Sequence, residues 1–424
     1  MLLWLPLSHD FALSYIDALF TSASAVTLTG AAVVPVAEFT VFGQVVILVL
    51  VQIGGLGIMT LAAVLFMLLG RRFAMRDRMV MQESLGEDTN QGIVKLTRRV
   101  VVFALVTEAA GAVLLLYPFI AAEGAHGIFT AVFTAVSAFC NAGFTICTGG
   151  VSLSAYAGNP LVLLTVALLA VLGGLGFVVV LDIGSRRGDF KRCRLHTKVV
   201  LTASLALLAL GTAIFFAAEY SMPETLGGMS FGGKLMNAFF HSVNCRTAGF
   251  TTFDVAALTP ASKMFTMILM FVGGSPGSAA GGIKVTVMVA VICIFLAELR
   301  RKDEIVMFKR TVSRDTCFRA AAGFFAGVLC VISLAFILFF TEKGALTAAG
   351  LYSGFDLVFE SVSIFSTTGF DVGLVPHFSV VGKIVCVFVM FMGKIGVISF
   401  GAAFLKSVDG DEKLRYPEDT LLIG

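Results

Sequence analysis

The sequence predicts an all-α polytopic membrane protein made of four similar units around a central pore. Each unit consists of a membrane helix, a short re-entrant pore helix and a second membrane helix. Two observations predict this class. The 424 residues are 58% hydrophobic and only 13% charged, with a mean hydropathy of +0.96, whereas soluble proteins carry roughly 25% charged residues. In addition, glycine and phenylalanine recur in register along the chain. The composition excludes an ordinary soluble globular protein.

The internal repeat is marked by four glycines, each ten residues after a phenylalanine. The pairs are Phe20 and Gly30, Phe133 and Gly143, Phe239 and Gly249, and Phe359 and Gly369. Three of these glycines are followed 24 residues later by another glycine, and in the second unit the match comes six residues late; these partners are Gly54, Gly173, Gly273 and Gly393. Chance alignment of so many positions is improbable, so the spacing of 106 to 120 residues indicates a fourfold repeat.

The units are predicted at residues 1–70, 92–185, 195–300 and 318–407, followed by a cytoplasmic tail at 408–424. Apolar runs of about 20 residues can span a bilayer. Such runs precede three of the glycine turns and follow all four, starting near Val100, Val199 and Phe318, and near Val41, Leu161, Lys263 and Val380. The outer helix of the first unit is missing or truncated. We therefore expect an in-frame hydrophobic segment encoded upstream of Met1. No signal-peptide pattern explains the start.

The basic residues predict the orientation. Three stretches and the tail, namely 71–99, 186–198, 300–319 and 406–415, hold 23 of the 30 Lys and Arg residues. The positive-inside rule places these stretches and the C-terminus in the cytoplasm and the glycine turns outside. The net charge of +3 is thus explained by topology, and nucleic-acid binding is a poor interpretation. The eight cysteines show no metal-binding spacing. Cys140 and Cys147 could pair outside, although membrane cysteines are usually just small apolar residues.

The segment between each phenylalanine and its glycine is too short to span a bilayer, which predicts a re-entrant helix beside a cavity. Its C-terminus would point inward with partial negative charge that favours a cation. Glycine permits the positive φ that aims successive carbonyls at one axis, and four such turns form an oxygen ring that replaces an ion's hydration shell. Close helix packing is the alternative role for a single glycine, but four in register favour the ring. The predicted ion-binding residues are Thr27, Leu28, Thr29, Gly30, Asn141, Ala142, Gly143, Thr247, Ala248, Gly249, Thr367, Thr368 and Gly369.

The turn motifs resemble the four filter loops of the Trk/Ktr/HKT superfamily of potassium transporters, and most closely those of its KtrB-like membrane subunits. The motifs are Thr27-Leu28-Thr29-Gly30-Ala31, Asn141-Ala142-Gly143-Phe144, Arg246-Thr247-Ala248-Gly249-Phe250 and Ser366-Thr367-Thr368-Gly369-Phe370. Segments 52–57, 195–198 and 415–417 are similar too. The resemblance covers nearly the whole chain and implies a potassium-selective filter, with glycine at all four key positions. It also implies a homodimer in the bacterial cytoplasmic membrane, bound to a cytoplasmic KtrA-like ring of nucleotide-binding regulatory subunits.

A glycine-rich loop interrupts the second membrane segment of the third unit. Its residues are Gly273, Gly274, Ser275, Pro276, Gly277, Ser278, Ala279, Ala280, Gly281 and Gly282. Five glycines and a proline cannot hold a straight helix, and a broken span must face protein or a water-filled cavity. The family resemblance implies an intramembrane gate below the filter. The alternative is a kink that allows tight helix packing. A nucleotide-binding P-loop is excluded, because isoleucine separates Gly282 from Lys284.

Lys394 is a charge inside an otherwise apolar span, where charges normally face a bundle interior or an aqueous path. The resemblance implies arginine at this position lining the pore, and lysine keeps the positive charge without the planar fork. We expect Lys394 to form an exit barrier beside the glycine-rich loop, with snorkelling to an interface as the alternative. Further candidates are outer-mouth carboxylates that could concentrate cations or simply be solvated, and an arginine that braces the third turn or acts in function. These residues are Glu38, Asp254, Asp371 and Arg246.

The predicted function is potassium uptake, and the rival class is a sodium-coupled or sodium-conducting secondary cation transporter. Alternating-access folds show inverted halves with broken helices in matching pairs. Here four parallel repeats are expected, with only the third strongly broken, which favours a gated pore. An enzyme is not indicated, because His9, His126, His196, His241 and His377 are scattered and no catalytic set recurs. No cofactor site is found in this chain, so any nucleotide would bind the regulatory partner.

Overall fold

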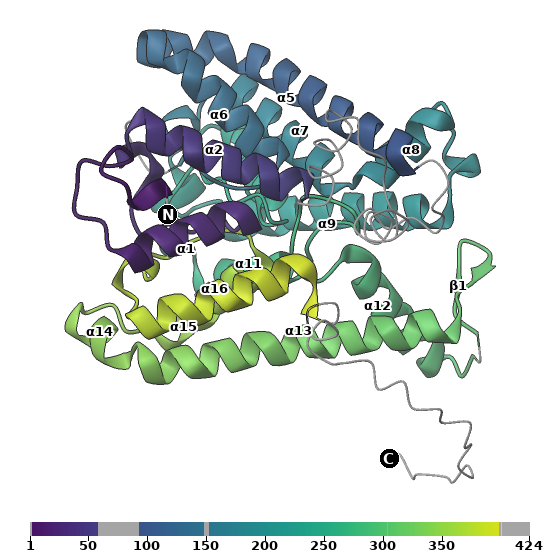
Figure 1. The fold of residues 1–424 in the computed structure, drawn as a ribbon. Helices are drawn as coiled ribbons and strands as arrows, with labels where there is room; N and C mark the ends of the chain where they lie inside the picture. Colours follow the sequence, from purple (N-terminus) through teal and green to yellow (C-terminus); the bar gives the residue numbers. More distant parts are fainter. Residues whose placement is uncertain (1, 58–92, 148–151, 303, 398–399, 401–424) are drawn as a thin grey trace.

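The fold is predominantly helical, which confirms the all-α part of the predicted fold class. The computed structural model describes residues 2–57, 93–147, 152–302, 304–397 and 400. Its helices are α1 (Tyr15–Thr27), α2 (Val41–Leu56), α5 (Ile93–Glu123), α6 (Gly127–Phe139), α7 (Pro160–Gly174), α8 (Phe177–Ser185), α9 (Leu195–Glu219), α10 (Phe231–Asn244), α11 (Pro260–Phe271), α12 (Val285–Leu299), α13 (Arg314–Thr341), α14 (Lys343–Ala348), α15 (Gly354–Ser366) and α16 (Val380–Ile395) (Figure 1). Strands β1 (Val306–Met307) and β2 (Arg310–Thr311) form a short antiparallel hairpin. The predicted tail at 408–424 and residues 58–70 of the first unit lie outside the described residues.

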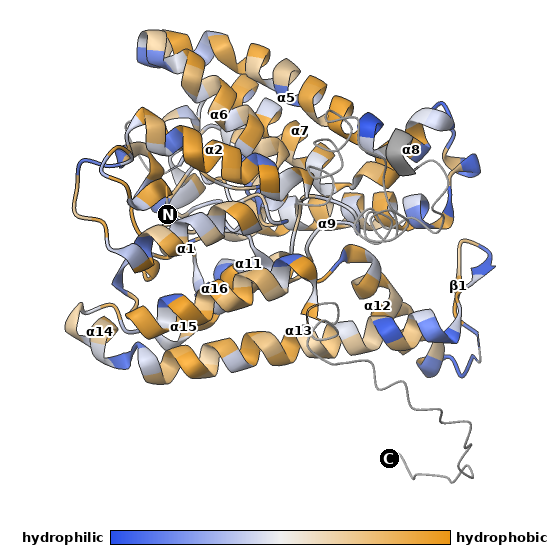
Figure 2. Cartoon of the chain, viewed as in Figure 1, coloured by the Kyte–Doolittle hydropathy of each residue, from blue (hydrophilic) through white to orange (hydrophobic). Residues whose placement is uncertain are grey.

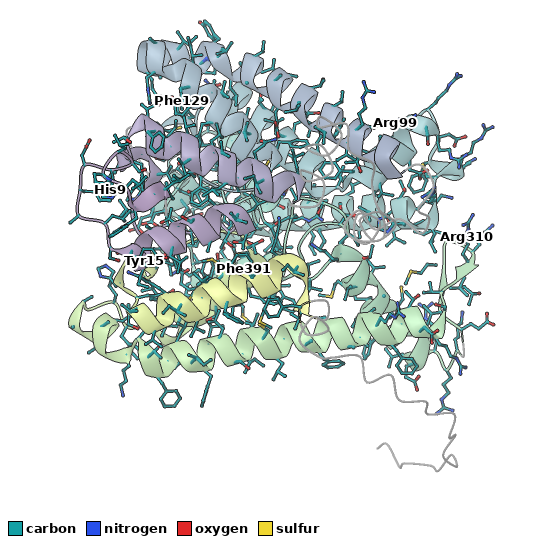
Figure 3. The ribbon with its side chains drawn as sticks, viewed as in Figure 1. His9, Tyr15, Arg99, Phe129, Arg310 and Phe391 are labelled. Carbon is teal, nitrogen blue, oxygen red and sulfur yellow. The ribbon has the colours of Figure 1, made fainter. Side chains whose placement is uncertain are left out.

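Three helical stretches of the described chain are long and apolar enough to cross a membrane. They are Thr97–Phe139, which combines α5 and α6, Leu195–Glu219 and Arg314–Thr341. Hydrophobic residues cover the helices between the two ends of the molecule, and hydrophilic residues gather toward the ends (Figure 2). Arg99 and Arg310 lie at one end, and His9, Tyr15 and Phe129 lie toward the other (Figure 3). This distribution is that of a helical membrane protein.

The second unit also contains a sharp break after its glycine turn, and this corrects the expectation that only the third unit is strongly broken. α7 and α8 meet at a bend of 93°, at Gly176 with φ of 86°. α2 and α16 end at Gly57 and Gly396, whose φ values are 81° and 98°. Glycine adopts this backbone region without the steric penalty of a side chain. Each of these segments therefore ends or turns at a glycine.

Serine and threonine residues define where the short helices begin. Ser14, Ser230 and Ser353 precede α1, α10 and α15, and each side chain accepts a hydrogen bond from the backbone N–H three residues later, at 3.1 to 3.3 Å. Thr259 and Ser379 do the same for α11 and α16. Such N-caps satisfy backbone donors that a helix start leaves unpaired. The polar residues thus end each loop and begin the next helix at a defined residue.

Buried glutamates at the ends of long helices hold the starts of their neighbours. Glu219, at the end of α9, accepts hydrogen bonds from the N–H and hydroxyl of Thr259 at 3.1 and 2.7 Å. Glu342 follows α13 and binds the same two groups of Ser379 at 2.6 and 2.7 Å. A carboxylate at a helix N-terminus also interacts favourably with the helix dipole. These contacts link α9 to α11 and α13 to α16.

The glycines spaced 24 or 30 residues after the turns lie against the short helices. A Cβ atom added to Gly54, Gly173 or Gly393 would lie 2.1, 1.8 or 1.8 Å from the carbonyl oxygen of Val26, Phe139 or Phe365. Each of these oxygens belongs to the residue four before the turn glycine. Only glycine allows so close an approach, which explains the spacing in units one, two and four. In the third unit, Gly273 instead meets Gly281 within its own loop, at 2.0 Å.

We expect Gly393→Ala to destabilise the protein, because its new methyl group overlaps a backbone carbonyl that a side-chain rotation cannot move. Overpacking of this kind costs about 1–3 kcal/mol. Thermal unfolding of the detergent-purified protein measures the effect as a lower midpoint. Gly184→Ala is the matched control, since Gly184 lies in α8 with nothing within 4 Å of an added Cβ. An equal midpoint for both variants would contradict the close-packing explanation.

Candidate functional site

The four glycine turns share one backbone conformation. We name them turn 1 (residues 27–30), turn 2 (140–143), turn 3 (246–249) and turn 4 (366–369). Each follows the C-terminus of a short helix, α1, α6, α10 or α15. The turn glycines Gly30, Gly143, Gly249 and Gly369 have φ values of 80°, 71°, 77° and 80°, and the residues two before them, Leu28, Asn141, Thr247 and Thr367, have 61°, 55°, 64° and 53°. Two left-handed residues per turn recur at equivalent positions. Non-glycine residues rarely adopt this conformation.

The turns contact one another in a closed cycle. Each turn glycine lies against the carbonyl oxygen of the residue just before the glycine of the next turn. Measured from an added Cβ, the distances are 2.5 Å from Gly30 to Ala142, 3.0 Å from Gly143 to Ala248, 2.2 Å from Gly249 to Thr368 and 2.2 Å from Gly369 to Thr29. Residues more than 300 positions apart in the sequence therefore meet, and the last turn returns to the first. These eight predicted residues are brought together at one place.

In turns 1 and 4, two side-chain hydroxyls bond to each other and to the preceding helix. In turn 1, Thr27 Oγ1 donates to Ala23 O at 2.8 Å and lies 2.8 Å from Thr29 Oγ1. In turn 4, Ser366 and Thr368 repeat this pattern, with Ser366 Oγ donating to the carbonyl four residues earlier at 2.7 Å and 2.8 Å from Thr368 Oγ1. These hydroxyls are tied back to the helix that precedes the turn. Turns 1 and 4 thus share one local hydrogen-bond network.

Other polar side chains hold turns 2 and 3. Ser137 Oγ donates to Phe144 O at 2.8 Å, and the Phe250 N–H donates to Asn244 Oδ1 at 3.1 Å. Each bond joins a short helix to the residue directly after the turn glycine. Buried hydrogen bonds of this kind restrict the backbone because losing one leaves an unsatisfied group. Ser137 and Asn244 were not predicted from the sequence, although each is a polar residue near the end of a short helix.

The glycine-rich loop 273–282 packs against turn 4 and the ends of α7 and α16. Its Ser275 and Ala279 N–H groups donate to Gly174 O and Gly173 O at 3.1 and 3.3 Å, and its Gly282 N–H donates to Gly393 O at 3.2 Å. A Cβ on Gly281 would lie 2.0 Å from Thr367 Oγ1. The loop is therefore held by backbone hydrogen bonds to two other units and touches one of the turns.

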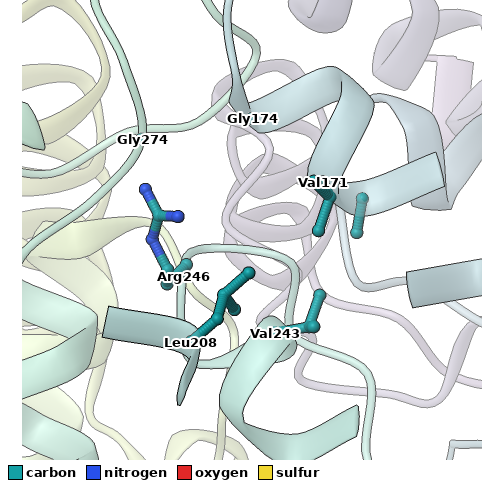
Figure 4. Close-up of a pocket in the computed structure, with 7 residues that line it drawn as sticks. Val171, Gly174, Leu208, Val243, Arg246 and Gly274 are labelled. Atoms are coloured by element: carbon teal, nitrogen blue, oxygen red, sulfur yellow. The ribbon is translucent and has the colours of Figure 1, made fainter. Parts of the chain in front are cut away.

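Three basic side chains donate to carbonyl oxygens of this loop. Lys394 Nζ donates to Ala279 O, and Lys284 Nζ donates to the adjacent Ala280 O at 2.7 Å. Arg246 Nη2 donates to Gly273 O at 3.4 Å, and its side chain extends toward Gly274 beside a small pocket (Figure 4). The internal bond of Lys394 contradicts snorkelling. Arg246, which belongs to turn 3, thus also contacts the glycine-rich loop, whereas Lys284 was considered from the sequence only in the excluded P-loop match.

The predicted outer-mouth carboxylates have local roles where the structure gives them partners. Asp254 Oδ1 accepts the Ala256 N–H at 2.9 Å, and Asp371 Oδ1 accepts the Gly373 and Leu374 N–H groups at 2.7 and 3.1 Å. These three bonds stabilise the start of a short turn at each aspartate. Glu38 is exposed. Cys140 and Cys147 are both free and buried, so the disulfide considered from the sequence does not form here.

The fold resembles that of a solved transport protein. The crystal structure of the potassium transporter TrkH from Vibrio parahaemolyticus matches with a TM-score of 0.72 at 18% identity, covering 93% of this chain and 79% of that chain. The similarity establishes the fold alone. The protein thus has the helical architecture of that structure.

The family is established by sequence. The family model described as "TrkH: Cation transport protein" matches residues 2–416, and the chain belongs to this family of transporters, which are not enzymes. It is 38% identical over 426 residues to the Ktr system potassium uptake protein B of Bacillus subtilis, covering all of this chain and 93% of that protein. The protein of the same name from Vibrio alginolyticus is 37% identical, with 100% and 91% covered. The potassium/sodium uptake protein NtpJ of Enterococcus hirae is 36% identical, with 97% and 90% covered.

Proposed function

We propose that this protein takes up potassium across the bacterial cytoplasmic membrane, as the ion-translocating subunit of a regulated system. The observation that carries the proposal is the closed cycle of contacts among the four turn glycines and the carbonyls before them. A ring of backbone carbonyls can replace the hydration shell of a monovalent cation. In this proposal, turns 1 to 4 form the selectivity filter and potassium is the cargo.

The short helices support the same assignment. α1, α6, α10 and α15 all end where the turns begin, so the C-terminal ends of four helices converge on the ring. Helix C-termini carry partial negative charge. This field favours a cation at the ring without placing a carboxylate there. The four helices therefore act as re-entrant pore helices, and the four units surround one pore.

The glycine-rich loop is proposed to be the gate. It touches turn 4 through Gly281 and is held by Lys394 at Ala279. Two groups on the ion's exit path would oppose conduction in this state: the loop itself and the positive charge of Lys394. A gate of this kind opens when the hydrogen bonds that hold the loop are exchanged for others. The regulated step is thus a movement of loop 273–282.

A sodium-conducting or sodium-coupled transporter is the second candidate. One observation favours it, namely that a relative at 36% identity is named a potassium/sodium uptake protein. Broken helices occur in more than one unit here, as the α7–α8 bend shows, and this removes one argument against alternating access. The cyclic arrangement of the turns still favours a pore, because alternating-access sites lie between two halves.

The proposed partners and membrane orientation are based on the Ktr names of the relatives and on the charge distribution. We propose a homodimer embedded in membrane lipid, with a KtrA-like ring on its cytoplasmic side carrying any nucleotide. Arg99 and Arg310 lie at the same end of the molecule (Figure 3), which is the end that the positive-inside rule assigns to the cytoplasm. That end, with the basic loops, would meet the regulator.

Ion uptake in a strain that lacks its own potassium transporters tests the proposal. We expect the protein to restore growth at low potassium and to take up potassium in preference to sodium, with higher flux when a regulator is present. The Gly249→Ser variant is the control, because uptake that falls in this variant is uptake carried out by the protein and not by the host strain. Uptake of sodium with no potassium preference would support the second candidate instead.

A further inference from the structure

The four pore helices differ at the position nine residues before each turn glycine. This position is Thr21 in α1, Thr134 in α6, Phe240 in α10 and Glu360 in α15. All four side chains are buried. The hydroxyls of Thr21 and Thr134 have no hydrogen-bond partner within the described structure. The backbone of the turns is thus fourfold, whereas the side chains behind them are not, and only the fourth unit places a carboxyl group there.

Glu360 binds the segment that leaves turn 4. Its side chain is 1% exposed, and its Oε1 accepts the Val372 N–H at 2.7 Å. The carboxyl group also lies near that of Asp371. No lysine or arginine of the described residues forms an ion pair with it, since Lys263 is paired with Asp356 instead, at 3.0 Å. A buried carboxyl group is costly unless it is hydrogen-bonded, so its place here indicates a specific role.

A second contact holds the same segment from the other side. Phe370, directly after Gly369, stacks on His241 of α10 with ring centroids 5.1 Å apart and planes 2° apart. The chain leaving turn 4 is therefore fixed twice within three residues, by Phe370 against α10 and by Val372 against α15. Both contacts lie outside the ring of carbonyls but are separated from Gly369 by no more than three residues.

We infer that Glu360 is a positioning residue for turn 4, which sets the ion preference of the ring by holding the Val372 backbone. This inference rests on the proposed function. Glu360 accepts the Val372 N–H, whereas the hydroxyls of Thr21 and Thr134 bind no group of the described structure, so only turn 4 is held by a side chain at this position among these three turns. A firmly held turn keeps its carbonyl oxygens at the spacing that suits one ion. Glu360 acts on the ring through the Val372 backbone, which it holds by a hydrogen bond.

The test compares Glu360→Gln with Glu360→Met. Glutamine keeps an oxygen that accepts the Val372 N–H and adds an N–H group that can donate to Asp371, whereas methionine fills the same space without either. We expect Glu360→Met to lower the potassium-over-sodium uptake ratio about tenfold, because it leaves a buried backbone donor unpaired. Glu360→Gln should stay within about twofold of the wild type, since it preserves that bond. Thr21→Ala, at the same position of α1, is the matched control and should not change the ratio.

Hydrogen exchange of the segment around Val372, measured by mass spectrometry, provides a readout independent of transport. Exchange should be faster in Glu360→Met than in Glu360→Gln and the wild type. The inference is overturned if Glu360→Met keeps the wild-type ratio and exchange, or if Glu360→Gln is impaired as much as Glu360→Met. Should the wild-type protein show no potassium preference, the proposed function fails, while the exchange comparison still decides whether Glu360 holds the turn.

Discussion

Serine in place of Gly249 or Gly369 is expected to lower potassium uptake at least about tenfold and to raise relative sodium uptake. Each new Cβ would lie 2.2 Å from a carbonyl oxygen of the next turn. Each would also adopt a positive φ, which costs an L-residue about 1–2 kcal/mol. The turn must shift to relieve both, and about 1.4 kcal/mol on the barrier is tenfold in rate. Initial rates of potassium and sodium uptake measure the effect.

Serine variants of the four turn glycines should lower potassium uptake to different extents, in the order of how closely the added Cβ approaches the next turn. Gly30 has a corresponding distance of 2.5 Å and Gly143 one of 3.0 Å, so Gly143→Ser should be the mildest variant. Gly124→Ser is the matched control, because Gly124 also has a positive φ of 64° but nothing within 4 Å of an added Cβ. If all four variants kept the wild-type affinity and ion preference, the turns would not form the filter.

The turns could be predicted from sequence because their geometry depends on residue type. A positive φ selects glycine, and a Cβ at Gly393 would overlap Phe365 O, so both constraints recur as glycine at fixed spacing. The α7–α8 bend was not predicted, because glycine in an apolar run serves helix packing in some places and a bend in others. Gly173 occupies the equivalent packing position, and the extra bend at Gly176 was indistinguishable from helix-packing glycine within an apolar run.

Contacts between units could not be predicted from the sequence. Lys383 on α16 pairs with Asp17 on α1 at 2.7 Å, joining the last unit to the first. The pair partners are separated by nearly the whole chain, and many other lysines and aspartates could have paired. Lys284 and Glu360 were overlooked because a single charged residue near an apolar run indicates a helix end as readily as a buried bond. The role of such a residue can be assigned only when the structure shows which groups it contacts.

Shortening the glycine-rich loop is expected to raise potassium flux and to reduce its dependence on the regulator. Deleting Pro276 to Ala280 removes the carbonyls that accept from Lys394 and Lys284. A partner shifts an equilibrium only by its differential affinity for the two states. Without the hydrogen bonds that stabilise the closed state, regulator binding has a smaller effect on the equilibrium between the closed and open states. The potassium-over-sodium preference should remain, because the cycle of turn glycines does not include these residues. Uptake of both ions, with and without the regulator, measures this result.

The Lys394→Ala variant should also raise flux, because it removes both a bond to the loop and a positive charge from the exit path. Lys394→Arg is the conservative control, since arginine retains the charge and can donate to Ala279 O. We expect Lys394→Arg to resemble the wild type in flux and in regulator dependence. A loop-deleted protein that inserts normally, conducts no faster and stays fully regulator-dependent would show that the loop is a packing kink. The gate would then lie elsewhere, and the bonds from Lys394 and Lys284 would serve only to hold the loop to α16 and to the start of α12.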